Sequence, residues 1–329
     1  MNIVGMIKDL SRDFGLQYFL YNEIYPDSGM PYAVKLQLSI DGLSYSTWGV
    51  SENKDLAFFK ALMELIERIS ADRFCSIIYE KSFFKRSIAI ESICQRFNVT
   101  TSHLFPNNTN GVAINLSKSA AKSGAFLELL ERHTVLTALF LDIPPFKIKT
   151  SELFLGSIKF SLEFFYWQVS KFYIVVAVAF TDTGNFLFSH SCRISLDDAI
   201  ERAYHELIPN LLFFSGKDLS LKEVKIVRDD ISSFRDYWLY SGDNRAHAFL
   251  NSFSSEISNK YQKIPVLKDV YYSELPIPSY FKNFVPDLRC IRAISPQAQQ
   301  LFFDSWNRND VHPALLGLSN LPDFPHFIA

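Results

Sequence analysis

The chain has 329 residues, of which 48% are hydrophobic, so it can bury a large core. Its formal net charge of −2 and its scattered Lys and Arg create no basic field that would attract nucleic acid, and we expect no nucleic-acid binding. No apolar run exceeds strand length and no signal-peptide pattern opens the chain, so we expect a cytoplasmic protein without membrane spans. The four dispersed cysteines indicate free thiols, not a disulfide framework.

The first half of the chain predicts a strand pair and two helices. Residues 32–48 alternate apolar and polar side chains around an Asp41-Gly42 turn, which predicts two paired strands. Ser51 and Asn53 can begin a first helix, which runs from Asp55 to about Phe74. A short strand over 112–115 then precedes a second helix over 118–139, which ends before Pro144-Pro145.

The second half predicts another strand pair and a third helix. Residues 173–180 form a continuous apolar run typical of a buried strand, and a hairpin turn over 182–185 returns the chain as a strand from Phe186. Ser195 and the two aspartates after it can cap the third helix. We therefore predict an α+β fold in which units of a strand pair and a helix are duplicated. We expect a single domain over 1–329, with an N-terminal extension over 1–31 and a peripheral insertion at about 215–275.

One phrase recurs on the three predicted helices, beginning at Ala57, Ala121 and Ala199. In each copy Ala stands seven and three residues before a Glu, and Leu follows that Glu. The first two copies end in Glu-x-x-Glu-Arg, which places two carboxylates on one face of each helix. A single copy would be explained by a salt-bridged exposed face. Two such helices facing each other would gather four carboxylates, which predicts a site for divalent metal ions and phosphates at Glu64, Glu67, Glu128 and Glu131.

Four stretches in order resemble the YcaO family, ATP-dependent enzymes that activate peptide backbone amides, typically to form azolines or thioamides in ribosomally made peptides. Ala57-x-x-Lys60-Ala61-x-x-Glu64-x-x-Glu67-Arg68 is similar to the family's first helix. The other three stretches are Asn110-Gly111-Val112-Ala113 with Ala125-x-x-Glu128-x-x-Glu131-Arg132, Asp198-Ala199-x-x-Arg202-Ala203-x-x-Glu206, and Arg289-Cys290-Ile291-Arg292-Ala293-Ile294-Ser295-Pro296.

The resemblance implies a YcaO-like fold whose antiparallel or mixed sheets and helices meet at a central nucleotide site. It implies ATP and Mg²⁺ as cofactors, with Glu64, Glu67, Glu128 and Glu131 as the metal ligands. Arg132 would face a phosphate, and Arg292 would approach one from the last strand. No covalent nucleophile is required, and we assign no catalytic residue.

The chain departs from the family pattern at several positions. The family's Gly-Lys-Gly appears as Gly49-Val50-Ser51, and the serine of the first helix is replaced by Lys60. We expect Lys60 to supply the positive charge that is lost at Val50. An expected acidic residue is Ala120, and Ser123 stands where some members have Gln, so we place Ser123 among the nucleotide contacts.

The histidines give no metal-ligand spacing. His133 and His205 lie beside repeat motifs; we expect a packed or solvent-facing position for His133 and a structural role for His205. His326 lies in a tail that is similar to a family segment pointing to the active site.

The resemblance also implies partners. A ribosomal precursor peptide is the expected substrate, and a separate leader-peptide-binding or accessory protein is expected because the chain shows no such domain. A homodimer or pairing with a second YcaO-like subunit is also plausible. Val50, Lys60 and Ala120 keep open an alternative in which the chain is an inactive scaffold or substrate-binding subunit of a modification complex.

Overall fold

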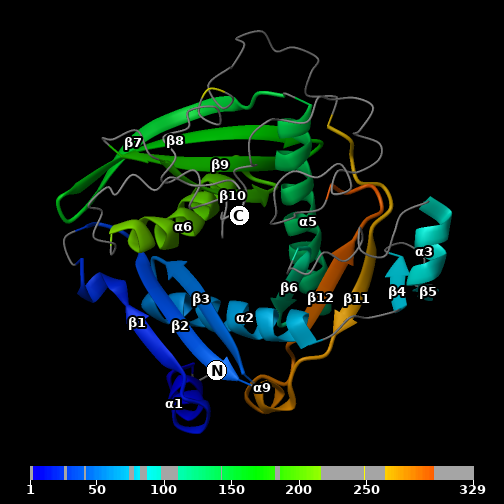
Figure 1. Ribbon diagram of the computed structural model, residues 1–329, viewed down its shortest axis with the longest axis horizontal. Helices are drawn as coiled ribbons and strands as arrows, with labels where there is room; N and C mark the ends of the chain where they lie inside the picture. The colour runs from blue at the N-terminus through cyan, green and yellow to red at the C-terminus, as the bar shows by residue number, and fades with distance from the viewer. Residues whose placement is uncertain are drawn as a thin grey trace. The chain divides into compact units, whose positions relative to one another are not determined.

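A computed structural model describes residues 3–25, 28–40, 42–73, 78–81, 87–97, 110–141, 143–181, 186–215, 248 and 264–299 (Figure 1). The predicted turn at 182–185, most of the predicted insertion and the tail with His326 lie outside these residues. The chain divides into two compact units. Unit 1 contains 1–101, 107–129 and 270–294, and unit 2 contains 102–106, 130–269 and 295–329.

Unit 1 begins with a three-stranded antiparallel sheet packed against two helices. The strands are β1 (Gln17–Leu20), β2 (Tyr32–Ile40) and β3 (Leu43–Ser51) in that order, and a 3-10 turn, η1 (Tyr21–Glu23), follows β1. The helices α1 (Ile3–Phe14) and α2 (Lys54–Arg73) share one hydrophobic core with the sheet. In this core Leu10, Val34, Leu36 and Leu62 have no solvent exposure. The predicted strand pair and first helix are confirmed.

Unit 1 also holds a five-stranded antiparallel sheet with strand order β5, β4, β11, β12, β6. Its strands are β4 (Ile78–Lys81), β5 (Ser87–Ala89), β6 (Val112–Asn115), β11 (Tyr271–Leu275) and β12 (Arg289–Ile294). Two short helices, α3 (Ile90–Phe97) and α9 (Ser279–Phe284), belong to the same unit. The last residues of the predicted insertion thus form β11, between β4 and β12.

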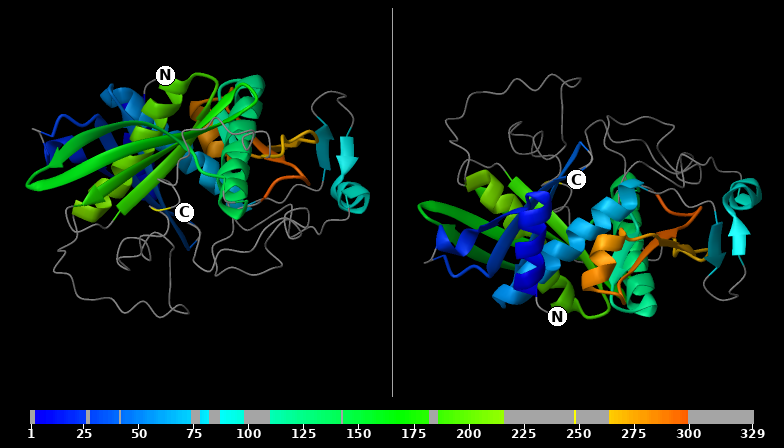
Figure 2. Two further views of the ribbon diagram at one scale, coloured as in Figure 1. Left: turned by 90° about the horizontal axis from the view of Figure 1, so that it is seen from above. Right: turned by 90° about the horizontal axis from the view of Figure 1, so that it is seen from below.

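Unit 2 contains a four-stranded antiparallel sheet and the third predicted helix (Figures 1 and 2). Its strands are β7 (Phe146–Leu155), β8 (Ile158–Val169), β9 (Phe172–Thr181) and β10 (Phe186–Arg193), and its helix is α6 (Leu196–Ser215). The helix packs on β9 and β10, as Figure 2 shows. The strand pair β9–β10 and the helix were predicted, whereas the long hairpin β7–β8 was not.

The helix α5 (Lys118–Phe140) is the second predicted helix, and its residues up to Leu129 belong to unit 1. Small residues permit its close approach to β6. A Cβ on Gly124 would lie 2.9 Å from the Cβ of Ala113, closer than ordinary packing allows.

The repeated alanines are explained by the same kind of contact between α2 and β3. Ala57 and Ala61 are fully buried, and a Cβ on Gly49 would collide with the backbone of both residues. The alanines of the repeat therefore keep this face of α2 free of large side chains. As a result β3 lies directly on the helix, one turn before Glu64.

One buried hydrogen bond occurs in the same place in both units. The hydroxyl of Thr47 on β3 donates to the carbonyl of Ala61 at 2.9 Å, and the hydroxyl of Ser189 on β10 donates to the carbonyl of Ala203 at 2.5 Å. In both cases the two residues are 14 positions apart. This correspondence supports the internal duplication, because aligning Thr47 with Ser189 also aligns Glu64 with Glu206. The α+β fold of antiparallel sheets is confirmed.

No helix in the described part of the chain is long and apolar enough to cross a membrane. Three described cysteines are free: Cys192 and Cys290 are buried, and Cys94 is partly buried. Cys75 lies outside the described residues.

Candidate nucleotide and magnesium site

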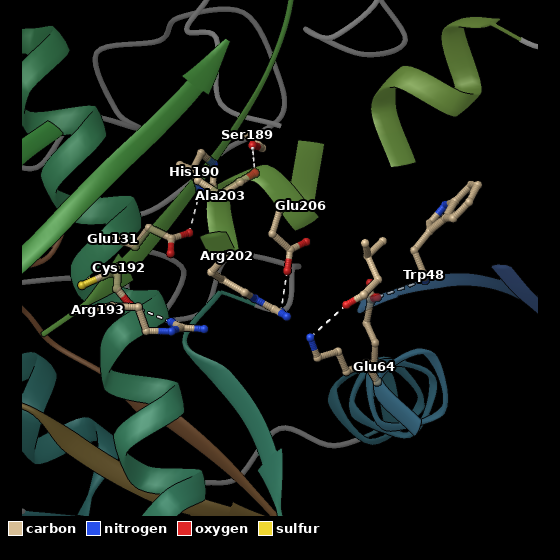
Figure 3. Close-up of polar contacts among 12 residues, drawn as sticks. Trp48, Glu64, Glu131, Ser189, His190, Cys192, Arg193, Arg202, Ala203 and Glu206 are labelled. Carbon is tan, nitrogen blue, oxygen red and sulfur yellow. Dashed lines mark hydrogen bonds and ion pairs between the residues drawn. The ribbon is translucent and has the colours of Figure 1, made fainter. Parts of the chain in front are cut away.

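The carboxylate of Glu64, on α2, is oriented by two neighbours in unit 1. Its Oε2 accepts a hydrogen bond from the backbone N–H of Trp48 on β3 at 3.1 Å (Figure 3). Its Oε1 accepts from Arg68, one turn further along the helix, at 2.7 Å. The sequence predicts the contact with Arg68 as an ordinary i, i+4 ion pair. The contact with Trp48 fixes the direction of the carboxylate.

Glu67 lies one turn after Glu64 and has a perturbed acidity. Burial raises its pKa well above the usual value, and the charges of Glu128 and Glu64 raise it further. Arg68 and a hydrogen bond from the backbone N–H of Ile114 act in the opposite direction. Within unit 1, Glu64 and Glu128 are thus close enough for their charges to act on Glu67, and this repulsion is the electrostatic condition that a bound cation would relieve.

The donor set fits Mg²⁺. Among the described residues, no three His, Cys, Asp or Glu side chains converge closely enough to enclose a metal ion on their own. An enclosed cage is not what Mg²⁺ requires, because it is usually bound by one or two carboxylates together with water and substrate phosphates. Carboxylates grouped around Glu67 suit that mode of binding.

Glu131, one helical turn after Glu128 on α5, belongs to unit 2 and has a different set of partners. Its Oε1 lies 2.6 Å from Nδ1 of His190 on β10 (Figure 3). Nη1 of Arg132 lies 2.9 Å from Nε2 of the same imidazole. Arg132 can only donate, so Nε2 accepts and Nδ1 carries the proton that is donated to Glu131.

The charges of this network agree with that assignment. Burial and Arg132 lower the pKa of His190, so the imidazole is neutral at neutral pH. Burial alone would raise the pKa of Glu131, but the hydrogen bond from His190 and the positive charges of Arg132 and Arg193 outweigh it and hold that pKa below its usual value. Glu131 is therefore an ionised carboxylate whose second oxygen is not engaged by His190, and this suits a metal ligand oriented by a neighbouring group.

Further cations lie in the same part of unit 2. Arg193 is the last residue of β10 and donates to the carbonyl of Cys192 at 2.6 Å. Burial and the nearby charge of Arg202 lower the pKa of Arg193. Arg202 on α6 pairs with Glu206 at 2.5 Å (Figure 3). The positive charges of Arg193 and Arg202 therefore lie near the carboxylates of Glu131 and Glu206.

The remaining predicted nucleotide contacts occupy different environments. Lys60 donates a hydrogen bond to the carbonyl of Val50 at 2.8 Å. Its ammonium therefore lies beside Val50, the position at which the family's lysine is missing. Ser123 is exposed on α5. Arg292 is 5% exposed on β12, and its charge and that of Glu67 both act on the thiol of Cys290. Arg292 therefore lies in the neighbourhood of the unit 1 carboxylates.

His133 is buried, so of the packed and solvent-facing positions expected for it the packed one is observed. Its Nε2 donates to the carbonyl of Pro265 at 2.9 Å, and its Nδ1 accepts from the backbone N–H of Gln299 at 3.0 Å. It thereby joins two distant segments of unit 2 to α5. His205 is buried on α6 beside the ring of Tyr204.

Sequence reasoning missed His190, Arg193 and the backbone N–H of Trp48. A contact made by a backbone N–H does not depend on the side chain of that residue, so the sequence gives no sign of it. His190 and Arg193 could have been noticed as polar residues in an apolar strand that leads directly into the third copy of the repeat.

The fold and the paired carboxylates fit an enzyme class that uses a nucleotide and magnesium. The sequence profile of the family described as YcaO cyclodehydratase, ATP- and Mg²⁺-binding, matches residues 92–264, just over half of the chain. The chain therefore belongs to the YcaO family, and it is an ATP- and Mg²⁺-dependent enzyme of that family. The match includes Glu128, Glu131 and Arg132, whereas Glu64 and Glu67 precede it.

Solved structures share the fold at low sequence identity. YcaO from Methanopyrus kandleri, bound with AMPPCP and Mg²⁺, has a TM-score of 0.63 and 14% identity over 98% of this chain and 96% of its own. A heterocyclase in complex with substrate and cofactor has a TM-score of 0.64 and 12% identity over 96% of this chain. The chain spans 55% of that heterocyclase's length. A comparison with curated protein sequences found no match.

Proposed function

We propose that the carboxylates of α2 and α5 hold Mg²⁺ and the phosphates of ATP, and that this site activates backbone amides of a ribosomal precursor peptide. The observation that carries the proposal is the grouping of Glu64 and Glu128 around Glu67, which raises the Glu67 pKa. Buried like charges are costly unless a cation offsets them. The chain's family supports ATP as the bound phosphate compound.

In this proposal each predicted residue has a separate role. Glu64, Glu67, Glu128 and Glu131 bind Mg²⁺, and His190 orients Glu131 through its Nδ1 proton. Arg132, Arg292 and Lys60 contact phosphates, and Ser123 contacts the nucleotide. Bound Mg²⁺ supplies charge neutralisation on the phosphates. Arg193 and Arg202 add positive charge in unit 2, where anionic oxygens would be stabilised.

The chemistry requires no covalent bond to the protein. A side chain of the peptide, or external sulfide, adds to a peptide carbonyl and leaves an oxyanion. That oxygen takes the terminal phosphoryl group of ATP, and ADP leaves. Loss of a proton and of phosphate then gives the azoline or thioamide. The contribution of the protein is positioning and electrostatic stabilisation.

An accessory protein that delivers the peptide belongs to the same proposal. A solved relative, the E. coli microcin synthetase McbBCD complex with pro-MccB17 bound, shares the fold at a TM-score of 0.50 and 12% identity. By analogy this chain would act with a leader-binding partner, as a homodimer or with a second YcaO-like subunit.

The test traces the carbonyl oxygen of the substrate amide. A candidate precursor peptide carrying heavy oxygen in its backbone carbonyls is incubated with the protein, its accessory protein, ATP and Mg²⁺. The proposal predicts that the label appears in inorganic phosphate and that the Glu128→Gln variant releases none. Modified peptide with its heavy oxygen lost to water instead would contradict phosphorylation of the amide.

A further inference from the structure

A buried hydrogen bond joins the strand β3 to the helix α2 beside Glu64. The hydroxyl of Thr47 donates to the carbonyl of Ala61 at 2.9 Å, and neither residue has any solvent exposure. Thr47 directly precedes Trp48, and Ala61 stands close to one helical turn before Glu64. The bond therefore lies next to the contact between the backbone N–H of Trp48 and Oε2 of Glu64.

Of the two neighbours that orient Glu64, the strand is the more rigid one. The side chain of Arg68 is 46% exposed and belongs to the same helix as Glu64, so this ion pair restrains the carboxylate only weakly. The N–H of Trp48 belongs to β3, which pairs with β2 along its whole length. Whether this N–H meets the carboxylate depends on where β3 lies along α2.

The packing between β3 and α2 does not determine that position by itself. The residues that face each other at this contact are small: Gly49 on the strand, and Ala57 and Ala61 on the helix. Small residues allow the close approach, but they have no long side chain that would interlock and prevent sliding. A hydrogen bond has a preferred length and direction, so the bond from Thr47 to Ala61 can define the alignment.

An ordinary packing role explains Thr47 less well. Buried hydroxyls are usually hydrogen-bonded, so one such bond has little meaning alone, and Val has nearly the same shape without a polar group to bury. However, the bond is repeated in unit 2, where the hydroxyl of Ser189 donates to the carbonyl of Ala203. There too the next residue, His190, orients a carboxylate, that of Glu131.

We propose that Thr47 is a positioning residue for Mg²⁺ binding. Its hydroxyl holds β3 at one place along α2, so that the N–H of Trp48 keeps the carboxylate of Glu64 in its observed direction. Thr47 itself contacts neither the metal nor the nucleotide. This role rests on the proposed function, in which Glu64 binds Mg²⁺.

Substitutions at Thr47 test this role by calorimetric titration with Mg·ATP. Thr47→Val removes the hydroxyl and keeps the shape, and it should weaken binding by roughly threefold to tenfold. This is less than the roughly 10–100-fold typical of groups that contact a metal ligand directly. Thr47→Ser keeps a hydroxyl and should restore most of the affinity. If Thr47→Val fails to fold, Thr47→Cys replaces it and should bind more weakly than Thr47→Ser, because S–H is a weaker donor.

Ser11→Ala is the matched control for the loss of a hydroxyl. The hydroxyl of Ser11, on α1, donates to the carbonyl of Leu16 at 2.8 Å, and this bond also lies within unit 1. It does not join β3 to α2, so Ser11→Ala should bind Mg·ATP like the unaltered protein. Equal weakening by Ser11→Ala and Thr47→Val would overturn the proposal, as would unchanged affinity in Thr47→Val.

A second measurement separates positioning from a general loss of structure. Thr47→Val is combined with Glu64→Asp, whose shorter side chain withdraws the carboxylate from the N–H of Trp48. If Thr47 acts through Glu64, the two effects are not additive, and Thr47→Val should weaken binding by roughly twofold or less in this background. The same fold-change in both backgrounds would overturn the proposal.

The unaltered protein distinguishes the two possible failures. If Mg·ATP binds equally to the unaltered protein and to Thr47→Val, the positioning role is wrong and the nucleotide site stands. If the unaltered protein does not bind Mg·ATP, the proposed nucleotide site is wrong, and the role of Thr47 is wrong with it.

Discussion

Nδ1 of His190 lies 2.6 Å from Oε1 of Glu131, and the Nε2 of that imidazole lies 2.9 Å from Nη1 of Arg132. A single neutral ring therefore orients both a predicted metal ligand and a predicted phosphate contact. The relationship joins β10 to α5 within unit 2. It converts two adjacent residues of a helix, Glu131 and Arg132, into one hydrogen-bonded network.

Replacement of this imidazole should weaken the site. We expect His190→Ala to reduce the affinity for Mg·ATP about tenfold or more, because groups that orient metal ligands typically have effects of this size. His190→Asn keeps an N–H donor near the position of Nδ1 and should retain more affinity than His190→Ala. Calorimetric titration of both variants checks this order, and equal affinities for the two variants and the unaltered protein would refute it.

Glu67→Gln should raise the stability of the metal-free protein and remove the stabilisation that Mg·ATP gives. Because burial, Glu128 and Glu64 raise the pKa of Glu67, a neutral side chain removes repulsion while still accepting from the N–H of Ile114. We expect the metal-free variant to be more stable by roughly 0.5–1 kcal/mol, the size of a partly solvated charge interaction. Thermal unfolding with and without Mg·ATP checks this. The variant should lose the stabilisation that the nucleotide gives, and a normal shift by Mg·ATP would count against Glu67 as a ligand.

Gly111→Ala should destabilise the sheet that carries Arg292. Gly111 has a φ of 70°, and an added Cβ would clash with the carbonyl oxygen of Ala293. We expect a loss of roughly 1–3 kcal/mol in the free energy of unfolding. Gly42→Ala is the matched control, because Gly42 has a φ of 79° but nothing lies within 4 Å of its added Cβ. Denaturant unfolding should show the larger loss at Gly111, and equal losses would exclude the steric contribution.

The buried thiols should be unreactive in the folded protein. Burial raises the pKa of the Cys192 and Cys290 thiols, so few thiolates form at neutral pH. Alkylation followed by peptide mapping should modify Cys94, which is partly buried, before either of them. Denaturant should make all three equally reactive. Rapid native labelling of Cys290 would show that the core of unit 1 opens readily.

The helices and two strand pairs were predictable because their side-chain periodicity matches their burial. Residues 32–48 alternate in the sequence and do so in β2 and β3, and the repeat alanines mark the buried faces of α2, α5 and α6. The hairpin β7–β8 was missed, because β7 is an edge strand whose side chains are mostly exposed, with only Leu153 and Leu155 buried.

The candidate site was predictable only in part. Glu-x-x-Glu spacing identifies carboxylates on one helix, and the association of Glu67 with Glu128 is consistent with that reasoning. The partners of the carboxylates come from strands, through the N–H of Trp48 and the ring of His190. Such contacts depend on where a strand lies along a helix. The spacing of residues within one helix does not determine that position.

The most direct test of the central claim is calorimetric titration of Mg·ATP into the unaltered protein and into Glu64→Gln and Glu128→Gln. Asp72→Asn, an exposed position near the end of α2, is the matched control. We expect the unaltered protein and Asp72→Asn to bind alike, and both glutamine variants to lose binding. Full binding by Glu64→Gln and Glu128→Gln would contradict the assignment of Mg²⁺ and ATP to these carboxylates.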